Sequence, residues 1–105
     1  MPQPSIAIVM PYYNEPAAWI EQAIASVLRQ TVPCALFMVA DGVARDDIEM
    51  AGAEDLRLPE RANDGGATPR TIGGRAAIEA GHDVIAYLDA DDMLDASTFS
   101  GDVTF

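Results

Sequence analysis

Three carboxylates stand just after a short apolar run near the end of the chain. Residues 84–88 read Val-Ile-Ala-Tyr-Leu, and Asp89, Asp91 and Asp92 follow them. A run of this length with β-branched and aromatic members predicts a central strand that is buried on both faces. Closely spaced aspartate oxygens suit a hard divalent ion such as Mn²⁺ or Mg²⁺. A solvated turn explains the same residues equally well, because Asp is a common turn residue.

A fourth carboxylate is predicted at the same edge of the sheet. Cys34–Ala40 is a second continuous apolar run, and Asp41 and Gly42 end it. A strand-helix-strand order with a right-handed crossover makes the two strands parallel, and open α/β sheets bind ligands beyond the carboxyl ends of their strands. We therefore expect Asp41 and Asp89 to converge on one crevice. The alternative for Asp41 is a simple Asp-Gly turn.

The first half of the chain supplies a strand and a helix to hold this edge. The apolar residues 5–10 predict a first strand that ends at Pro11, because Pro cannot donate to a sheet ladder. Two tyrosines follow, and either could stack on a ligand ring or pack over the sheet edge. Apolar residues at helical spacing then predict a helix over about residues 16–30, with Asn14 as its N-cap.

The second half repeats this pattern. Residues 55–59 alternate polar and apolar types, which favours a short edge strand. A glycine-containing loop then leads to a helix over about residues 68–80, with Thr68 as N-cap. Arg70 falls in the first turn of that helix, where the dipole disfavours a cation, so we expect it to contact a ligand. The predicted packing face of this helix consists of Ile72, Ala76 and Ala80.

Composition excludes several kinds of partner. The chain has 105 residues, enough for one domain or part of one, and its net charge is −11 from 17 acidic residues against 6 Arg and no Lys. Few basic side chains would be available to neutralise phosphates, so a nucleic-acid surface is not expected. No apolar run reaches the ~20 residues of a membrane span, and no basic segment resembles a signal peptide, so we expect a cytoplasmic location.

Taken together, these segments resemble the family 2 glycosyltransferases with the GT-A fold over about residues 5–95. The resemblance implies an α/β, Rossmann-like fold with a mostly parallel sheet of about four strands flanked by helices. It also implies that residues 1–105 are the N-terminal, nucleotide-diphospho-sugar-binding part of a single GT-A domain that is truncated here. The segments that carry the resemblance are Ile8–Glu15, Ala25–Thr31, Val39–Gly42, Arg61–Arg70 and the DxD-like Leu88–Asp92.

The resemblance also implies roles for individual residues. Tyr13 would lie by the nucleotide base, Asp41 would hydrogen-bond the base or ribose, and Arg70 would face the nucleotide. Asp89 would hold the ribose or help with the ion, and Asp91 would bind Mn²⁺ or Mg²⁺. The implied nucleotide-binding residues are thus Pro11, Tyr13, Glu15, Asp41, Arg70 and Asp89, and the implied metal ligands are Asp91 and Asp89.

The activity implied is metal-dependent transfer of a sugar, with inversion, from a nucleotide diphosphate sugar to an unknown acceptor. A divalent ion would stabilise the charge that grows on the leaving diphosphate. The general base of inverting members lies well after the DxD motif, so we expect it beyond Phe105, with the acceptor half absent from this chain. Thr71 stands where the family often has Asn. The alternative is a catalytically incomplete module that binds nucleotide or forms a homodimer.

Overall fold

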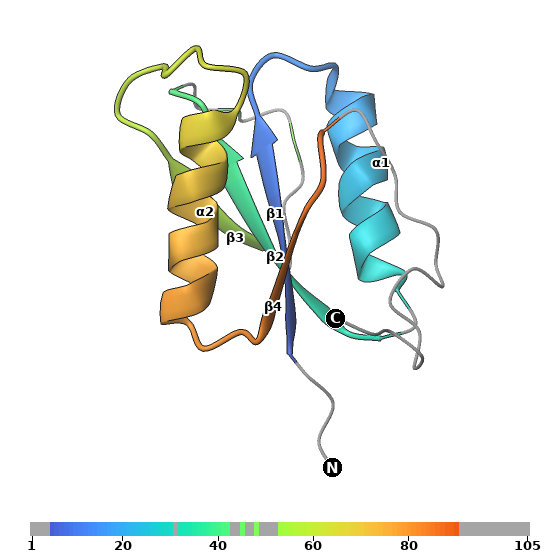
Figure 1. Ribbon diagram of the computed structural model, residues 1–105. Coiled ribbons are helices and arrows are strands. Elements are labelled where there is room, and N and C mark those ends of the chain that lie inside the picture. The colour runs from blue at the N-terminus through green and yellow to red at the C-terminus, as the bar shows by residue number, and fades with distance from the viewer. Residues whose placement is uncertain (1–4, 31, 43–44, 46–47, 49–52, 91–105) are drawn as a thin grey trace.

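The computed structural model describes residues 5–30, 32–42, 45, 48 and 53–90. Within them the chain forms four strands and two helices (Figure 1): β1 (Ile6–Tyr12), α1 (Ala17–Leu28), β2 (Cys34–Ala40), β3 (Ala53–Arg57), α2 (Ala67–Glu79) and β4 (Val84–Tyr87). The strands lie in the order β3-β2-β1-β4, and every neighbouring pair is parallel. The predicted α/β, Rossmann-like fold with a parallel sheet of about four strands is confirmed. Neither described helix has the length and apolar character to cross a membrane.

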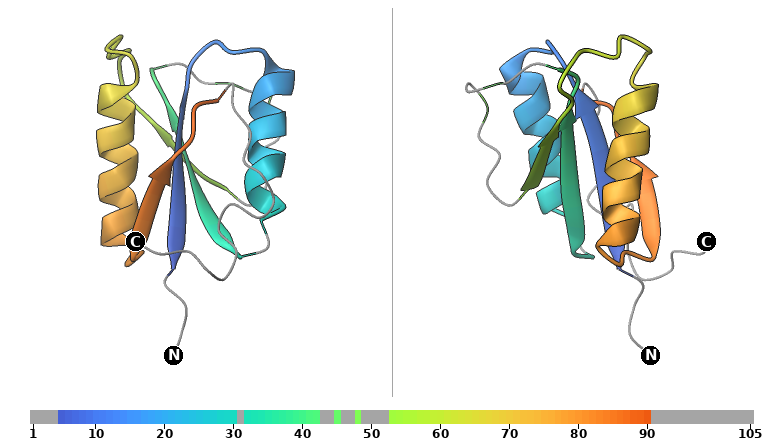
Figure 2. Two further views of the ribbon diagram at one scale, coloured as in Figure 1. Left: turned by 45° about the vertical axis from the view of Figure 1, so that its right-hand side comes forward. Right: turned by 90° about the vertical axis from the view of Figure 1, so that its left-hand side faces the viewer.

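The two helices cover opposite faces of the sheet (Figure 2). Successive side chains of a strand point to opposite faces, so β1 contributes to two separate cores. Ile8 and Met10 pack with Ile20 of α1, whereas Ala7 and Val9 pack with Ala77 of α2. Burial of β1 on both faces makes it the central element, and its carboxyl end is therefore held in place from both sides.

Helix α2 packs on the sheet through its smallest residues. A Cβ atom built on Gly73 would lie 2.4 Å from Cγ1 of Val9 and 2.9 Å from Cγ2 of Val39, so the helix lies too close to the sheet for any side chain there. The predicted face was wrong, because Ile72 and Ala80 are exposed. Close approach to the branched valines selects small residues over large apolar ones, and the buried positions are Pro69, Gly73, Gly74 and Ala77.

Strand β1 does not stop at Pro11, as the sequence predicted, but continues through it to Tyr12. The backbone of Tyr12 faces β2, since its carbonyl accepts the N–H of Asp41 at 2.9 Å. The carbonyl of Val9 accepts the N–H of Leu88 at 3.0 Å, so Val9 and, two residues on, Pro11 face the β4 side. Pairing with β4 has ended by then, and the missing N–H of Pro11 costs no ladder hydrogen bond.

Strand β4 lies at the edge of the described sheet, not at its centre as predicted. Its residues Val84–Ala86 are half-buried, and Tyr87 is 51% exposed. An apolar run indicates that a strand is covered by other parts of the protein, but it does not indicate whether neighbouring strands pair with it on one side or on both. Strand β3 was predicted correctly as an edge strand, although it begins and ends two residues earlier than expected.

The two helix starts also differ from the prediction. Helix α1 begins after Pro16 without any side-chain cap, so Asn14 does not cap it. Helix α2 begins after Gly66, and Asp64 takes the role expected of Thr68: its carboxylate accepts the backbone N–H of Thr68 at 3.2 Å and also the Thr68 hydroxyl. These hydrogen bonds hold the pKa of Asp64 below its ordinary value.

Candidate functional site

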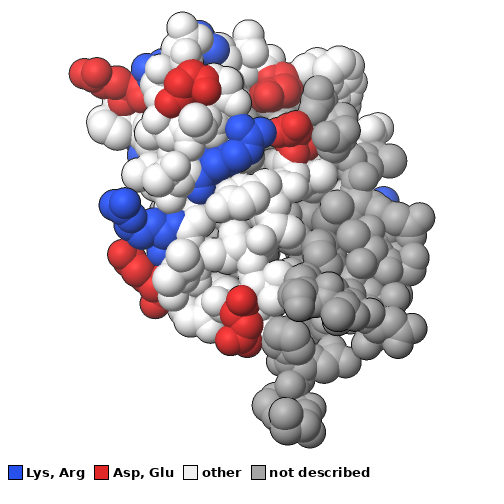
Figure 3. Space-filling model, viewed as in Figure 1, with Lys and Arg blue, Asp and Glu red and all other residues white. Residues whose placement is uncertain are grey.

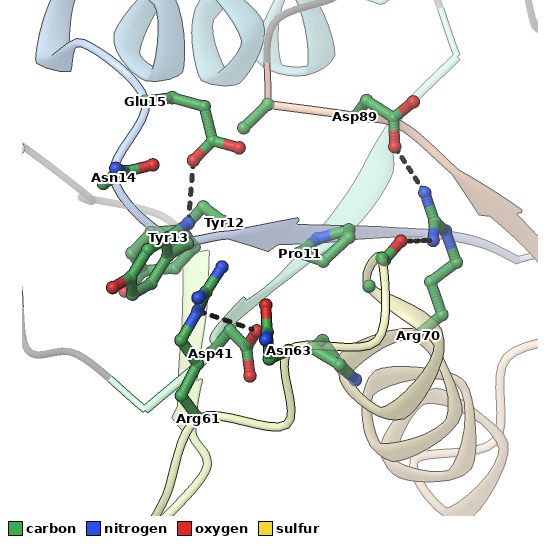
Figure 4. A pocket seen from close by; sticks show the side chains of 14 residues that line it. Pro11, Tyr12, Tyr13, Asn14, Glu15, Asp41, Arg61, Asn63, Arg70 and Asp89 are labelled. Atoms are coloured by element: carbon green, nitrogen blue, oxygen red, sulfur yellow. Dashed lines mark hydrogen bonds and ion pairs between the residues drawn. The ribbon is translucent and has the colours of Figure 1, made fainter.

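A pocket of about 380 Å³ opens at the carboxyl edge of the sheet, a size at the low end of small-molecule sites. Four stretches of chain line it: the end of β1 with the loop after it, the residue after β2, the loop before α2 with that helix's first turns, and the residues after β4. The side chains are drawn in Figure 4. They belong to Pro11, Tyr12, Tyr13, Asn14, Glu15, Asp41, Arg61, Asn63, Gly65, Gly66, Pro69, Arg70, Asp89 and Ala90.

The residues that the sequence singled out lie together in this pocket. The expected convergence of Asp41 and Asp89 is observed, since parallel strands bring their carboxyl ends to one edge. Asp91, one of the two expected metal ligands, lies outside the described residues. The pocket lining includes every one of the expected nucleotide-binding residues, namely Pro11, Tyr13, Glu15, Asp41, Arg70 and Asp89.

Asp41 forms the buried end of the pocket. The residue is 6% exposed, and its Oδ1 accepts the backbone N–H of Ala62 at 2.7 Å. Its Oδ2 lies 3.8 Å from Nε of Arg61. The next residue, Gly42, has φ of +83°, and a Cβ there would lie 2.4 Å from the backbone nitrogen of Arg61. The loop before α2 therefore packs directly against the end of β2, and this contact holds the carboxylate in one position.

Arg61 also stacks on Tyr13. The guanidinium carbon lies 3.8 Å from the centre of the tyrosine ring, within cation–π range. The loop carrying Tyr13 is itself held, because the Tyr13 N–H donates to the Glu15 carboxylate at 2.7 Å and Arg45 donates to the Tyr13 carbonyl at 2.9 Å. Glu15 thus closes its own loop. The ring and the guanidinium together form a flat, cationic wall beside Asp41.

Asp89 forms the open end of the pocket. Its Oδ1 lies 2.5 Å from Nη2 of Arg70, and the two side chains are 54% and 34% exposed. Nη1 of the same guanidinium donates to the carbonyl of Gly65 at 2.9 Å. Arg70 therefore ties three parts of the rim together: the glycine loop, the first turn of α2 and the end of β4. Figure 4 shows Asp89 and Arg70 across the pocket from Asp41 and Arg61.

Tyr12 forms part of the floor behind these residues. Its side chain is buried, and its hydroxyl donates to Oδ1 of Asp55 at 2.8 Å. Burial, followed by the hydrogen bond to Asp55 and that group's charge, raises the pKa of Tyr12 well above its ordinary value. The phenol therefore stays neutral, and it links the end of β1 to β3.

The donor chemistry of the rim suits a hard divalent ion. Within the described ranges no cluster of three or more His, Cys, Asp or Glu residues is placed to hold a metal. Mg²⁺, however, is commonly bound through one or two carboxylates, with water and substrate phosphates completing its shell. Asp89 offers such a carboxylate, because its side chain is more than half exposed at the mouth of the pocket.

Arg61 and Asn63 line the pocket although no individual role was predicted for either of them. Both belong to the loop segment Arg61–Arg70, which the sequence marked only as one of the segments that carry the family resemblance. Asn63 adopts φ of +53°, a left-handed conformation that Asn tolerates better than most residues, and this turns the chain toward the glycines. An Asn two residues before Gly-Gly was a usable turn signal. Nothing local in the sequence pairs Arg61 with Tyr13, because that contact depends on how the loop folds back.

Comparison with known proteins supplies independent information. The model of the family described as "Glycosyl transferase family 2" matches residues 7–101. Among solved structures, a crystal structure of S. aureus TarS is similar with a TM-score of 0.72 and 17% sequence identity, over 90% of this chain and 18% of that one. At this identity the likeness shows the fold alone. A comparison with curated proteins found no match.

Proposed function

We propose, because the chain belongs to glycosyl transferase family 2, that its pocket binds the nucleotide diphosphate sugar from which a sugar is transferred to an acceptor. The chain spans 18% of the length of the TarS chain that it matches, so the proposal concerns the donor site of such an activity. Of the described pocket residues, we assign none the role of general base. Activation of the acceptor, with inversion at the sugar, is therefore not assigned to them.

The observation that carries the proposal is the gathering of complementary groups in one pocket. Tyr13 and Arg61 offer a flat face on which a base could stack, and Asp41 beside them offers an acceptor for an N–H or ribose hydroxyl. Arg70, at the other end, offers the planar fork that matches phosphate oxygens. A stacking wall, a buried acceptor and a phosphate-binding cation are the groups that a nucleoside diphosphate requires.

The pocket is also suited to an anion in spite of the strongly acidic chain. On the face drawn in Figure 3, basic side chains are few and lie beside acidic ones, rather than forming a broad positive surface. Two of the six arginines, Arg61 and Arg70, line this pocket. We therefore assign it a small anionic ligand and not a nucleic acid, which would need a continuous basic surface.

We assign a divalent ion, Mn²⁺ or Mg²⁺, to Asp89, together with Asp91 from the part of the chain outside the described residues. When bound, such an ion stabilises the negative charge that grows on the leaving diphosphate. The chain's own part is to place the donor. The buried Asp41 would fix one end of the nucleotide, and Arg70 would orient the diphosphate toward the open rim at Asp89.

Thermal unfolding with and without ligands tests this function. UDP, GDP and dTDP are each added with and without Mn²⁺, and one of them should raise the free energy of unfolding in the presence of the metal. A nucleotide at about 100 times its Kd stabilises by roughly 2.7 kcal/mol. If none of the three produces a metal-dependent shift, the proposed metal-dependent donor site is wrong.

The same measurement tests the residues. Asp41→Asn and Asp89→Asn should each lose the ligand-induced shift relative to their own ligand-free baseline, and so should Asp91→Ala. Glu79→Gln is the matched control, since it removes one carboxylate at the exposed far end of α2, outside the pocket. A full shift in Asp41→Asn would contradict the assigned orientation of the nucleotide, while leaving donor binding itself intact.

A further inference from the structure

The arginine at the open end of the pocket is bound on two sides. Nη2 of Arg70 contacts Oδ1 of Asp89 at 2.5 Å, and Nη1 donates to the carbonyl of Gly65 at 2.9 Å. Gly66 leaves the space that the guanidinium uses, because a Cβ atom there would lie 2.7 Å from Nη1. Arg70 is therefore positioned as the counter-ion of the one described carboxylate that we assign to the metal.

We propose that Arg70 is a positioning residue that couples the binding of the divalent ion to the binding of the diphosphate. In the arrangement shown, its guanidinium competes with a divalent ion for Asp89, and the diphosphate oxygens draw it away when the nucleotide binds. This inference rests on the proposed function. It adds to that function a reason why the ion binds more tightly with the nucleotide than alone.

Electrostatics gives the direction and the size of the competition. A carboxylate paired with a guanidinium presents almost no net charge to an approaching ion. A divalent ion at Asp89 would also lie on the order of 5 Å from the guanidinium, and in water the repulsion over that distance weakens binding by about tenfold. The pair is more than one third exposed on both sides, so the aqueous figure is the appropriate one.

The diphosphate reverses this balance. A guanidinium donates two parallel hydrogen bonds to phosphate oxygens as readily as to a carboxylate, and these bonds are charge-assisted. Both hydrogen bonds of the Arg70 guanidinium, to the Gly65 carbonyl and to Asp89, are made at the rim of the pocket. Rotation about the side-chain torsions of Arg70 turns the guanidinium toward the pocket without any movement of α2. Once it has turned, Asp89 is open to the ion. Linkage then requires the ion to tighten nucleotide binding by the same factor.

Mn²⁺ binding to the whole chain, followed by the electron paramagnetic resonance signal of the free ion, tests the inference. The variants are Arg70→Met, which removes the charge without adding a metal ligand, and Arg70→Lys, which keeps the charge. The control is Arg75→Met, an exposed arginine on the same helix and outside the pocket. Thermal unfolding of each variant without ligand shows that the fold is retained.

Arg70→Met should bind Mn²⁺ alone about tenfold more tightly than the unchanged chain, with Arg70→Lys within about threefold of it and Arg75→Met equal to it. With UDP, GDP or dTDP present, the gain in Mn²⁺ affinity should be smaller in Arg70→Met. Unchanged or weaker binding of Mn²⁺ alone by Arg70→Met overturns the inference. An equal gain in Arg75→Met, or no measurable Mn²⁺ binding by any variant, overturns it too.

The two proposals fail in different ways. If no nucleoside diphosphate binds any variant, the proposed function fails, while the comparison of Arg70→Met with the unchanged chain in Mn²⁺ alone still decides whether Arg70 is the counter-ion of Asp89. If nucleotides bind in a metal-dependent way and Arg70→Met leaves the affinity for Mn²⁺ alone unchanged, the function stands and the coupling role of Arg70 is wrong.

Discussion

The two ends of the pocket use the same pair of residue types in different ways. Each end joins an aspartate to an arginine, but the Asp41 side chain is 9% exposed and that of Asp89 is 54% exposed. One oxygen of Asp41 accepts the backbone N–H of Ala62, and the other lies 3.8 Å from Nε of Arg61. Asp89 has Arg70 at 2.5 Å. The Asp41 carboxylate is held within the fold, and the Asp89 carboxylate is open to solvent, as the proposed exchange of its partner requires.

The position of each aspartate in the sheet explains this difference. Asp41 follows β2, which is paired on both sides, and its own N–H continues that pairing by donating to Tyr12. Asp89 follows β4, the edge strand of the described sheet, so a neighbouring strand supports it on one side only. A rigid end suits the orientation of a ligand, and an adjustable end suits a group that must change partners during binding.

The largest expected effect comes from the glycines that shape the two ends. Gly42→Ala should destabilise the chain by about 3 kcal/mol or more, because φ of +83° strains an L-residue and the new Cβ would meet backbone atoms of Arg61 at 2.4 Å. Gly66→Ala should cost only about 1 kcal/mol, since its φ of +89° is strained but the Cβ meets the movable end of Arg70. Urea unfolding followed by circular dichroism measures both, and equal losses would contradict the contrast.

The aspartates themselves should come next. Asp41→Ala leaves the backbone N–H of Ala62 without its acceptor in a partly buried loop, at a cost of about 2 kcal/mol. Asp89→Ala should change the free energy of unfolding by less than about 0.5 kcal/mol, because exposed ion pairs contribute little and Arg70 keeps its bond to Gly65. Urea unfolding of both variants measures these free energies. A larger loss of stability in Asp89→Ala than in Asp41→Ala would show that Asp89, and not Asp41, lies at the rigid end of the pocket.

A third test concerns Tyr12 behind the rigid end. Because its folded pKa is raised, the unfolded chain releases the phenol proton first as the pH rises above about 10, and stability falls from that pH upward. Tyr12→Phe should cost about 1 kcal/mol at neutral pH by loss of the bond to Asp55, and it should remove part of the alkaline decline. Unfolding free energies across this pH range measure both effects.

Tyr87→Phe is the control for that test. Tyr87 lies on β4 and is 51% exposed. Loss of its hydroxyl should change the free energy of unfolding at neutral pH by less than about 0.5 kcal/mol. If Tyr12→Phe and Tyr87→Phe change the free energy of unfolding in the same way as the pH rises above about 10, the hydroxyl of Tyr12 is not buried as the structure indicates.

The smallest effect should separate the arginines. Arg61→Gln loses a stacking contact with Tyr13 and a long ion pair with Asp41, for a cost of about 1 kcal/mol. Arg70→Met loses an exposed pair and should cost about 0.5 kcal/mol. Raising the salt concentration should reduce the loss of stability in Arg70→Met more than that in Arg61→Gln, because salt screens exposed ion pairs more effectively. An Arg70 loss that resists salt would place Asp89 in a less solvated setting than its exposure indicates.

The sequence by itself determined the order of elements and the edge at which chemistry gathers. Continuous apolar runs predicted β2 and β4, helical spacing predicted α1, and aspartates just after two parallel strands predicted one crevice. These features are local or follow from chain direction and handedness, so they can be read without a structure. Helix polarity and the position of the tyrosines had already marked Arg70 and Tyr13 as possible ligand contacts, and the resemblance to a family added their expected roles at a nucleotide. The structure places both residues in the same pocket.

Only the tertiary structure decided how firmly each of these residues is held. Whether β4 is central or at an edge depends on which strands pair, and the packing face of α2 depends on how closely Gly73 can approach Val9. The stacking of Arg61 on Tyr13 joins residues far apart in the chain. Such contacts depend on the three-dimensional approach of surfaces whose shapes no local pattern encodes. For that reason, two aspartates that look alike in the sequence become a buried and an exposed carboxylate in the fold.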